Sequence, residues 1–180
     1  MDELDQVDWS RLKHCYGRGV VSFGVEGDVS FAIAGDVSRS LAALRTDPSL
    51  AIGDGLYSNI CHQGTVYQAT AYAVPFIAVV AAGDVLDELR IPLVVLLGDI
   101  AIGGSYIAPH GSHAGSFGDH VDVLVTESLA ASMERLSTIR TPRLAALINA
   151  IQSLLVQPTV ESRDAVESAI DVALTPPATL

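Results

Sequence analysis

The stretch NICHQGTVYQAT, residues 59–70, separates two apolar runs in a chain of 180 residues. The run LAIGDGLY precedes it, and AYAVPFIAVV follows it. Gly64 can adopt the left-handed backbone that closes a helix, and the helix dipole favours His62 near a C-terminus. Thr65 and Thr70 are residues that cap or turn a chain into a new helix. The stretch therefore predicts a corner between two helices, and a ligand or partner site built on the same polar residues is the alternative.

Apolar residues recur at helical spacing on both sides of this corner. They predict helices over about 36–46, 49–63, 70–82, 84–103, 121–138 and 143–156, and a last short helix through 165–173. Pro75 is tolerated only if its helix begins near Thr70, because only the first turn can spare a backbone donor. Alternating apolar residues around a plausible turn predict a small β-hairpin at about 20–34.

The predicted helices group into consecutive pairs, each spanning roughly 30–35 residues, and such pairs stack into an α-solenoid. A loop rich in Gly, Ser and His covers 105–120. The expected architecture is a single all-α domain over residues 1–180, formed by stacked antiparallel helix pairs, with the hairpin near 20–34.

Composition narrows the classes of function. The net charge is −11, from 10 Lys and Arg against 21 Asp and Glu. Repulsion between this negative charge and phosphates argues against nucleic-acid binding. The same charge favours a basic protein partner. The alternative is that the acidic residues simply keep an apolar chain in solution. No apolar run reaches the ~18 residues of a membrane helix, and the acidic start MDELDQVDW is unlike a secretion signal. Cys15 and Cys61 without a CxxC indicate free thiols in a reducing compartment. We expect a cytoplasmic protein.

The His-rich loop contains candidate metal ligands, and one carboxylate lies within an apolar run. His110, His113 and His120 are weak candidates for metal ligands, because imidazoles suit zinc but their spacing matches no standard site; a mobile solvated loop is the alternative. Asp99 interrupts the apolar run VVLLGDIAI, so its carboxylate requires a partner such as an arginine or helix-end amides. No P-loop and no G-x-S-x-G elbow occur. The sequence predicts no catalytic residue and no cofactor.

Two stretches resemble a known family. Residues 9–17 carry W-x-x-L-x-H-x-YG, and residues 56–76 carry L-Y-x-N-I-x-HQGT-x-Y-x-AT-x-x-AVPF. Together they resemble a group of bacterial HEAT-repeat-like proteins of largely unassigned function. The resemblance implies an α-solenoid and no assigned catalytic residues, and some such proteins look like immunity proteins of bacterial toxins. The hairpin at 20–34 and the loop at 105–120 depart from the family's pattern.

We therefore expect a non-catalytic protein-binding module, most concretely an immunity or inhibitor protein that neutralises a bacterial toxin by direct binding. The expected partner is a basic protein, with no nucleic acid and no membrane. The candidate partner-binding residues are His62, Gln63, Tyr67, Asp54 and Asp99. Two alternatives stay open: a metal-binding protein or enzyme that uses the His-rich loop, and a structural homo-oligomer assembled through exposed apolar surface.

Overall fold

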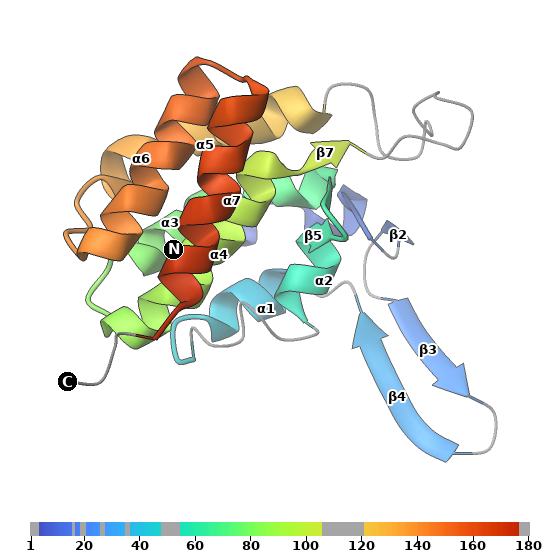
Figure 1. Cartoon of the computed structure of the whole chain (residues 1–180). Helices are drawn as coiled ribbons and strands as arrows, with labels where there is room; N and C mark the ends of the chain where they lie inside the picture. Colours follow the sequence, from blue (N-terminus) through green and yellow to red (C-terminus); the bar gives the residue numbers. More distant parts are fainter. Residues whose placement is uncertain are drawn as a thin grey trace.

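Helices make up most of the chain in the computed structural model, which describes residues 4–15, 17–18, 21–25, 28–34, 37–47, 55–105 and 121–176 (Figure 1). The α-helices are α1 (Val37–Ala43), α2 (Leu56–Ile60), α3 (Gln68–Ala81), α4 (Asp87–Ile102), α5 (Val121–Leu136), α6 (Pro142–Val156) and α7 (Val160–Leu174). Two short 3-10 helices, Leu4–Gln6 and Trp9–Arg11, begin the described chain. Across these ranges, no helix combines the length and the apolarity that spanning a membrane requires.

The strands are short and pair in three small sheets. Strand β1 (Lys13–His14) pairs with β2 (Gly17–Arg18), and β3 (Val21–Val25) pairs antiparallel with β4 (Asp28–Ala34). The β3–β4 pair confirms the hairpin expected at 20–34, and it extends away from the helices (Figure 1). Strands β5 (Cys61–His62), β6 (Thr65–Val66) and β7 (Gly104–Ser105) form the third sheet, in that order.

Most of the expected helices are present. Helices α5 and α6 cover the predicted stripes, and Pro142 opens α6 as its fixed φ favours. The last helix, α7, has 15 residues and is longer than expected. The helix expected over 49–63 is wrong at its C-terminal end, because α2 ends at Ile60 and the chain continues as strand β5. Residues 48–54 and 106–120 lie outside the described residues.

Pro75 lies in the interior of α3, which corrects the expectation that its helix begins near Thr70. The helix begins at Gln68, so Pro75 leaves the carbonyl of Ala71 without its usual intrahelical donor. The hydroxyl of Ser128, on α5, donates a 2.7 Å hydrogen bond to that carbonyl oxygen. A neighbouring helix thus supplies the donor that proline lacks, and α3 continues through Pro75.

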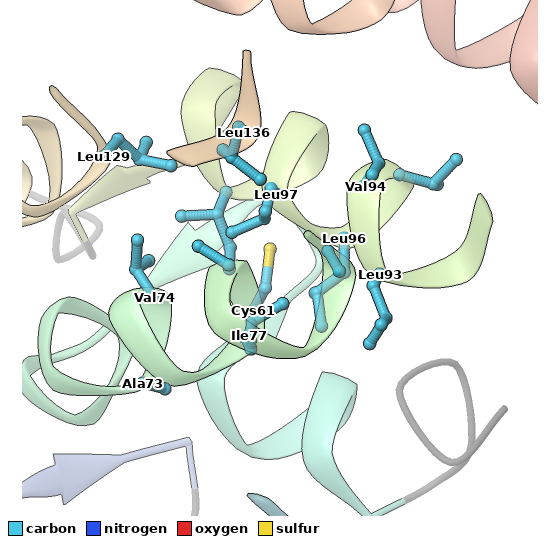
Figure 2. Close-up of a cluster of buried hydrophobic side chains, with 14 of the residues drawn as sticks. Cys61, Ala73, Val74, Ile77, Leu93, Val94, Leu96, Leu97, Leu129 and Leu136 are labelled. Carbon is cyan, nitrogen blue, oxygen red and sulfur yellow. The ribbon is translucent and has the colours of Figure 1, made fainter. Parts of the chain in front are cut away.

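The core forms where α4 packs against α3, α5, α6 and α7. Figure 2 shows side chains from α3, α4 and α5 around Ile77 and Leu97, with the sulfur of Cys61 among them. Gly98 permits this packing, since a Cβ at that position would lie 3.0 Å from Cδ1 of Ile170 on α7. The small residue therefore sets how closely α7 approaches α4.

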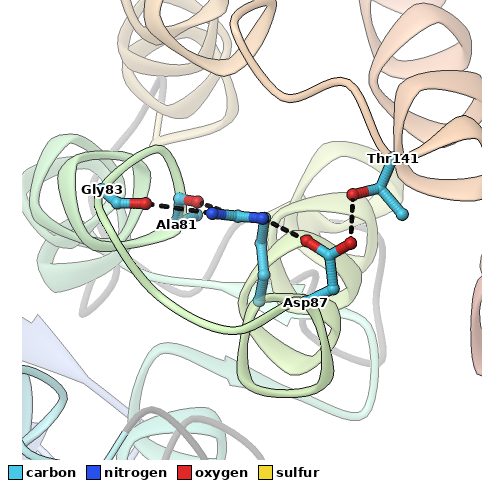
Figure 3. Close-up of polar contacts among 5 residues, drawn as sticks. Ala81, Gly83, Asp87 and Thr141 are labelled. Atoms are coloured by element: carbon cyan, nitrogen blue, oxygen red, sulfur yellow. Dashed lines mark hydrogen bonds and ion pairs between the residues drawn. The ribbon is translucent and has the colours of Figure 1, made fainter.

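A polar network joins two helix corners at one end of this core (Figure 3). The guanidinium of Arg90 donates to the carbonyl oxygens of Ala81 and Gly83, at 2.7 and 3.0 Å, and it forms an ion pair with Asp87. The other carboxylate oxygen of Asp87 accepts a 2.7 Å hydrogen bond from the hydroxyl of Thr141. Arg90 thus caps the end of α3, where free carbonyls favour a cation, and the network ties the α3–α4 corner to the start of α6.

Candidate functional site

The polar stretch after α2 forms a tight β-hairpin. Strand β5 pairs antiparallel with β6, so that His62 lies opposite Thr65. The two residues between them have positive φ, 50° at Gln63 and 75° at Gly64. Positive φ at both central positions is the signature of the two-residue hairpin turn that matches strand twist. The left-handed Gly64 is confirmed, but it closes a hairpin and not a helix.

Strand β7 attaches the end of α4 to this hairpin. It runs parallel to β6, and the amide of Gly104 donates a 2.9 Å hydrogen bond to the carbonyl of Gly64. The approach is close, because a Cβ at Gly103 would lie only 2.6 Å from Cγ1 of Val66. Glycine at 103 is therefore needed for the third strand to pair.

Hydrogen bonds at the base of the hairpin define where the neighbouring helices end and begin. The hydroxyl of Thr70 donates a hydrogen bond to the carbonyl of Ile60, at the end of α2, and it accepts a 2.8 Å hydrogen bond from the amide of Tyr67. The side-chain amide of Asn59 donates to the carbonyl of Gly55. Both polar side chains are buried, so they satisfy backbone groups that the corner would otherwise leave without partners.

The N-terminal segment packs on the same corner. The amide of Cys15 donates a 3.0 Å hydrogen bond to the carbonyl of Asn59. The amide of Lys13 donates a 3.3 Å hydrogen bond to the side-chain oxygen of Gln68. The rings of Trp9 and Phe76 lie 6.1 Å apart and are tilted by 56°. The two stretches that carry the family resemblance, 9–17 and 56–76, therefore contact each other, and much of their shared pattern has a structural role.

Next to the corner lies a half-buried acidic cluster formed by Tyr57, Cys61 and Asp99. Tyr57 comes from α2, Cys61 from β5 and Asp99 from α4. The Tyr57 hydroxyl is close enough to the Asp99 carboxyl to influence its pKa. Tyr57 and Asp99 are each half-buried, while Cys61 is fully buried. Among the described residues, the polar group that acts on Asp99 is therefore the phenol of Tyr57, and not an arginine or helix-end amides.

Burial dominates the protonation of this cluster. It raises the pKa of the Asp99 carboxyl above its usual range, and the hydroxyl of Tyr57 opposes that shift. Burial and then the negative charge of Asp99 raise the pKa of Tyr57, and the same two causes raise that of Cys61 to about 12. Cys61 is consequently a protonated thiol at neutral pH, and a protonated buried thiol is a poor nucleophile. The cluster suits recognition of charge better than covalent chemistry.

The predicted site residues occupy different environments. Gln63 is exposed at the tip of the hairpin, His62 is half-buried beside it, and Tyr67 is buried at the start of α3. Asp99 adjoins β5 through Cys61. The candidate partner-binding residues did not include Tyr57, which the sequence shows only as part of the L-Y-x-N-I motif. The candidates Asp54, His110, His113 and His120 lie outside the described residues.

Within the ranges that the structure describes, no three His, Cys, Asp or Glu side chains gather as metal ligands would. Comparison with protein-family models, with curated proteins and with solved structures finds no match for this chain.

Proposed function

We propose that this chain is a cytoplasmic protein-binding module without chemistry of its own, and that it acts as an immunity or inhibitor protein that neutralises a basic bacterial toxin by direct binding. The observation that carries the proposal is an excess of surface carboxylates that the chain's own cations do not balance. The His62–Gln63 tip and Asp99 are the proposed contact region, together with Asp54, whereas the predicted contact residue Tyr67 is buried at the start of α3.

The ionic groups of the chain are unevenly balanced at its surface. All ten Lys and Arg fall inside the described residues, so the chain has no other permanently cationic side chains. Exposed carboxylates without an ion pair within the described ranges are spread over three helical regions: Asp84, Glu88, Glu127, Glu134, Asp164 and Asp171. Such a surface attracts a basic partner and accelerates encounter, and salt weakens both effects.

The helix arrangement supports the proposal that the fold is HEAT-like. Helices α3 and α4 pack as one pair and α5 and α6 as the next, with α3 against α5 and α4 against α6. Two antiparallel pairs stacked in this way are the unit of an α-solenoid, whose successive helices and corners present an extended binding surface. Helix α7 packs on α6 and returns to α4, so in this proposal it caps the stack.

The hairpin tip supports its assignment to the contact region. The backbone of Gln63 has a φ of 50°, a left-handed conformation that glycine, asparagine or aspartate adopts more readily than glutamine does. Gln63 is exposed there, so core packing does not account for its choice. A strained polar residue at an exposed tip supports a role in recognition.

The test is a tagged pull-down from the native cell at low and at high salt, read by mass spectrometry. We expect one basic protein near equal stoichiometry, and we expect high salt to release it. A matched bait carries Asp84→Asn, Glu88→Gln, Glu127→Gln and Glu134→Gln, which removes charge at exposed positions only, and it should retain less of the partner at low salt. Recovery of the bait alone at both salt concentrations would overturn the proposal.

Self-association is favoured by one observation and is kept as the second candidate. Val156 and Val160, at the α6–α7 corner, have 80% and 70% of their surfaces exposed. Apolar side chains at one corner are a feature of contact surfaces between copies. Sedimentation of the purified chain at low concentration separates the two candidates, since a dimer that Val156→Ser dissociates would support self-association.

A further inference from the structure

A cavity of about 510 Å³ lies between the start of α6 and the end of α7. Its volume falls within the roughly 300–1,000 Å³ of ligand pockets in proteins. The guanidinium of Arg143, on α6, donates a 3.2 Å hydrogen bond to the carbonyl oxygen of Thr175, just after α7, so the two walls are joined. The described residues that line the cavity are Thr141, Pro142, Arg143, Val172 and Thr175.

The apolar part of this lining is accessible to another molecule. Val172 is 54% exposed, and Pro142 is exposed in the first turn of α6. The buried residues of α7 are Val166, Ile170 and Ala173. Core packing therefore does not account for an apolar side chain at position 172. Because its apolar walls are exposed, the cavity is open on one side, which suits a side chain presented by another protein better than a fully enclosed small molecule.

The polar part of the lining favours a neutral ring. The hydroxyl of Thr141 donates a 2.7 Å hydrogen bond to Asp87 (Figure 3), and this carboxylate disfavours an anionic group nearby. The hydroxyl of Thr175 donates a 2.8 Å hydrogen bond to the carbonyl of Asp171. Both hydroxyls are thus engaged within the protein. Of the described polar side chains in the lining, this leaves the guanidinium of Arg143, a planar cation of the kind that stacks on aromatic rings.

We propose that the cavity binds an aromatic side chain, tryptophan or tyrosine, of a protein partner. The ring lies against Pro142 and Val172, and the guanidinium of Arg143 stacks on its face. Aromatic side chains that fill pockets contribute much of the binding energy at protein interfaces. This inference rests on the proposed protein-binding function. It adds a contact at the other end of α4 from the β5–β6 hairpin, because α4 begins beside Thr141 and its 16 residues span roughly 24 Å.

The experiment titrates the methyl-labelled full chain with N-acetyl-tryptophan amide and follows the methyl groups of Val172 by NMR. The control probe, N-acetyl-cyclohexylalanine amide, is an apolar side chain without an aromatic face. We expect saturable shifts at Val172, and we expect the tryptophan probe to bind about two- to fivefold more tightly than the control, as for a cation–π contact at an exposed site. Apolar contact alone predicts no such preference, because the cyclohexyl ring is also apolar.

Arg143→Leu removes the guanidinium and keeps an apolar side chain, so it should abolish the preference for the aromatic probe. Arg143→Lys keeps the charge without the planar group, and its preference should lie between those of the wild type and Arg143→Leu. The matched variant Arg135→Leu removes an equal charge from an exposed position on α5 and should keep the full preference. Equal binding of the two probes, no shift at Val172, or a preference that persists in Arg143→Leu would overturn the inference.

The proposed function fails separately from this contact. A partner captured equally by the wild-type bait and by a bait carrying Arg143→Leu and Val172→Ser would overturn the aromatic contact alone. A tryptophan probe that binds at Val172, with no protein captured by the wild-type bait, would overturn the proposed function alone.

Discussion

Substitution of Ser128 by alanine tests how α3 tolerates an interior proline. The Ser128 hydroxyl lies 2.7 Å from the carbonyl oxygen of Ala71, the group that Pro75 leaves without a helical donor. Ser128→Ala leaves that acceptor unsatisfied, and an unsatisfied buried acceptor costs about 1–3 kcal/mol. Because Ser128 is half-buried and water can reach part of the site, we expect a loss of about 1–2 kcal/mol in the free energy of unfolding.

The double-mutant cycle with Pro75→Ala isolates the cause. Alanine at 75 restores an amide that can donate to the carbonyl of Ala71, so Ser128→Ala should then cost less than about 0.5 kcal/mol. Urea unfolding followed by circular dichroism measures all four proteins. The control Ser153→Ala removes an exposed hydroxyl whose acceptor, the carbonyl of Asn149, lies in a regular helix, and it should have little effect. Equal costs of Ser128→Ala in both backgrounds would refute the reasoning.

Three further predictions concern the core, the hairpin and the buried thiol. Gly98→Val should destabilise the protein by about 1–3 kcal/mol, because even a Cβ at that position would lie 3.0 Å from Ile170 on α7. The control Gly104→Ala should be near neutral in the same urea titration, because no atom lies within 4 Å of a Cβ added there. Gly64→Ala should cost about 1–2 kcal/mol, since φ there is 75° and a side chain is disfavoured at that angle; an unchanged thermal midpoint would contradict the turn. Cys61 should react with iodoacetamide more slowly than half-buried Cys15, and urea should abolish the difference. Because burial raises the pKa of the Cys61 thiol, its contribution to the free energy of unfolding is fully present below the unfolded thiol pKa of about 9 and is lost as the pH rises above that value. Unfolding followed between pH 8 and 10 should show this loss.

The longer helices were predictable because their apolar periodicity is local. The stripes of α5 and α6 each repeat over four turns, and the Pro142 start is read directly from the chain. The hairpin after Ile60 was not predictable in the same way, because strands of two residues have no periodicity. Gly64 signalled a left-handed residue, but a helix end and a hairpin turn use the same signal.

The misplaced start of α3 and the partner of Asp99 depend on contacts that are remote in sequence. Pro75 is tolerated because Ser128, 57 residues after Ala71, supplies a donor, and no local pattern announces that bond. For Asp99 the sequence correctly indicated a need for a partner, since a carboxylate interrupts an apolar run. It did not indicate Tyr57, because the pairing depends on how α2 meets α4.

The most direct test of the proposed binding function is native mass spectrometry of this protein purified from its own cell at low ionic strength. If the chain binds a basic protein directly, the spectrum should show a one-to-one complex with that protein, and the complex should dissociate as the ammonium acetate concentration is raised. Free chain alone, or copies of this chain bound only to each other, at low ionic strength would contradict the proposed function.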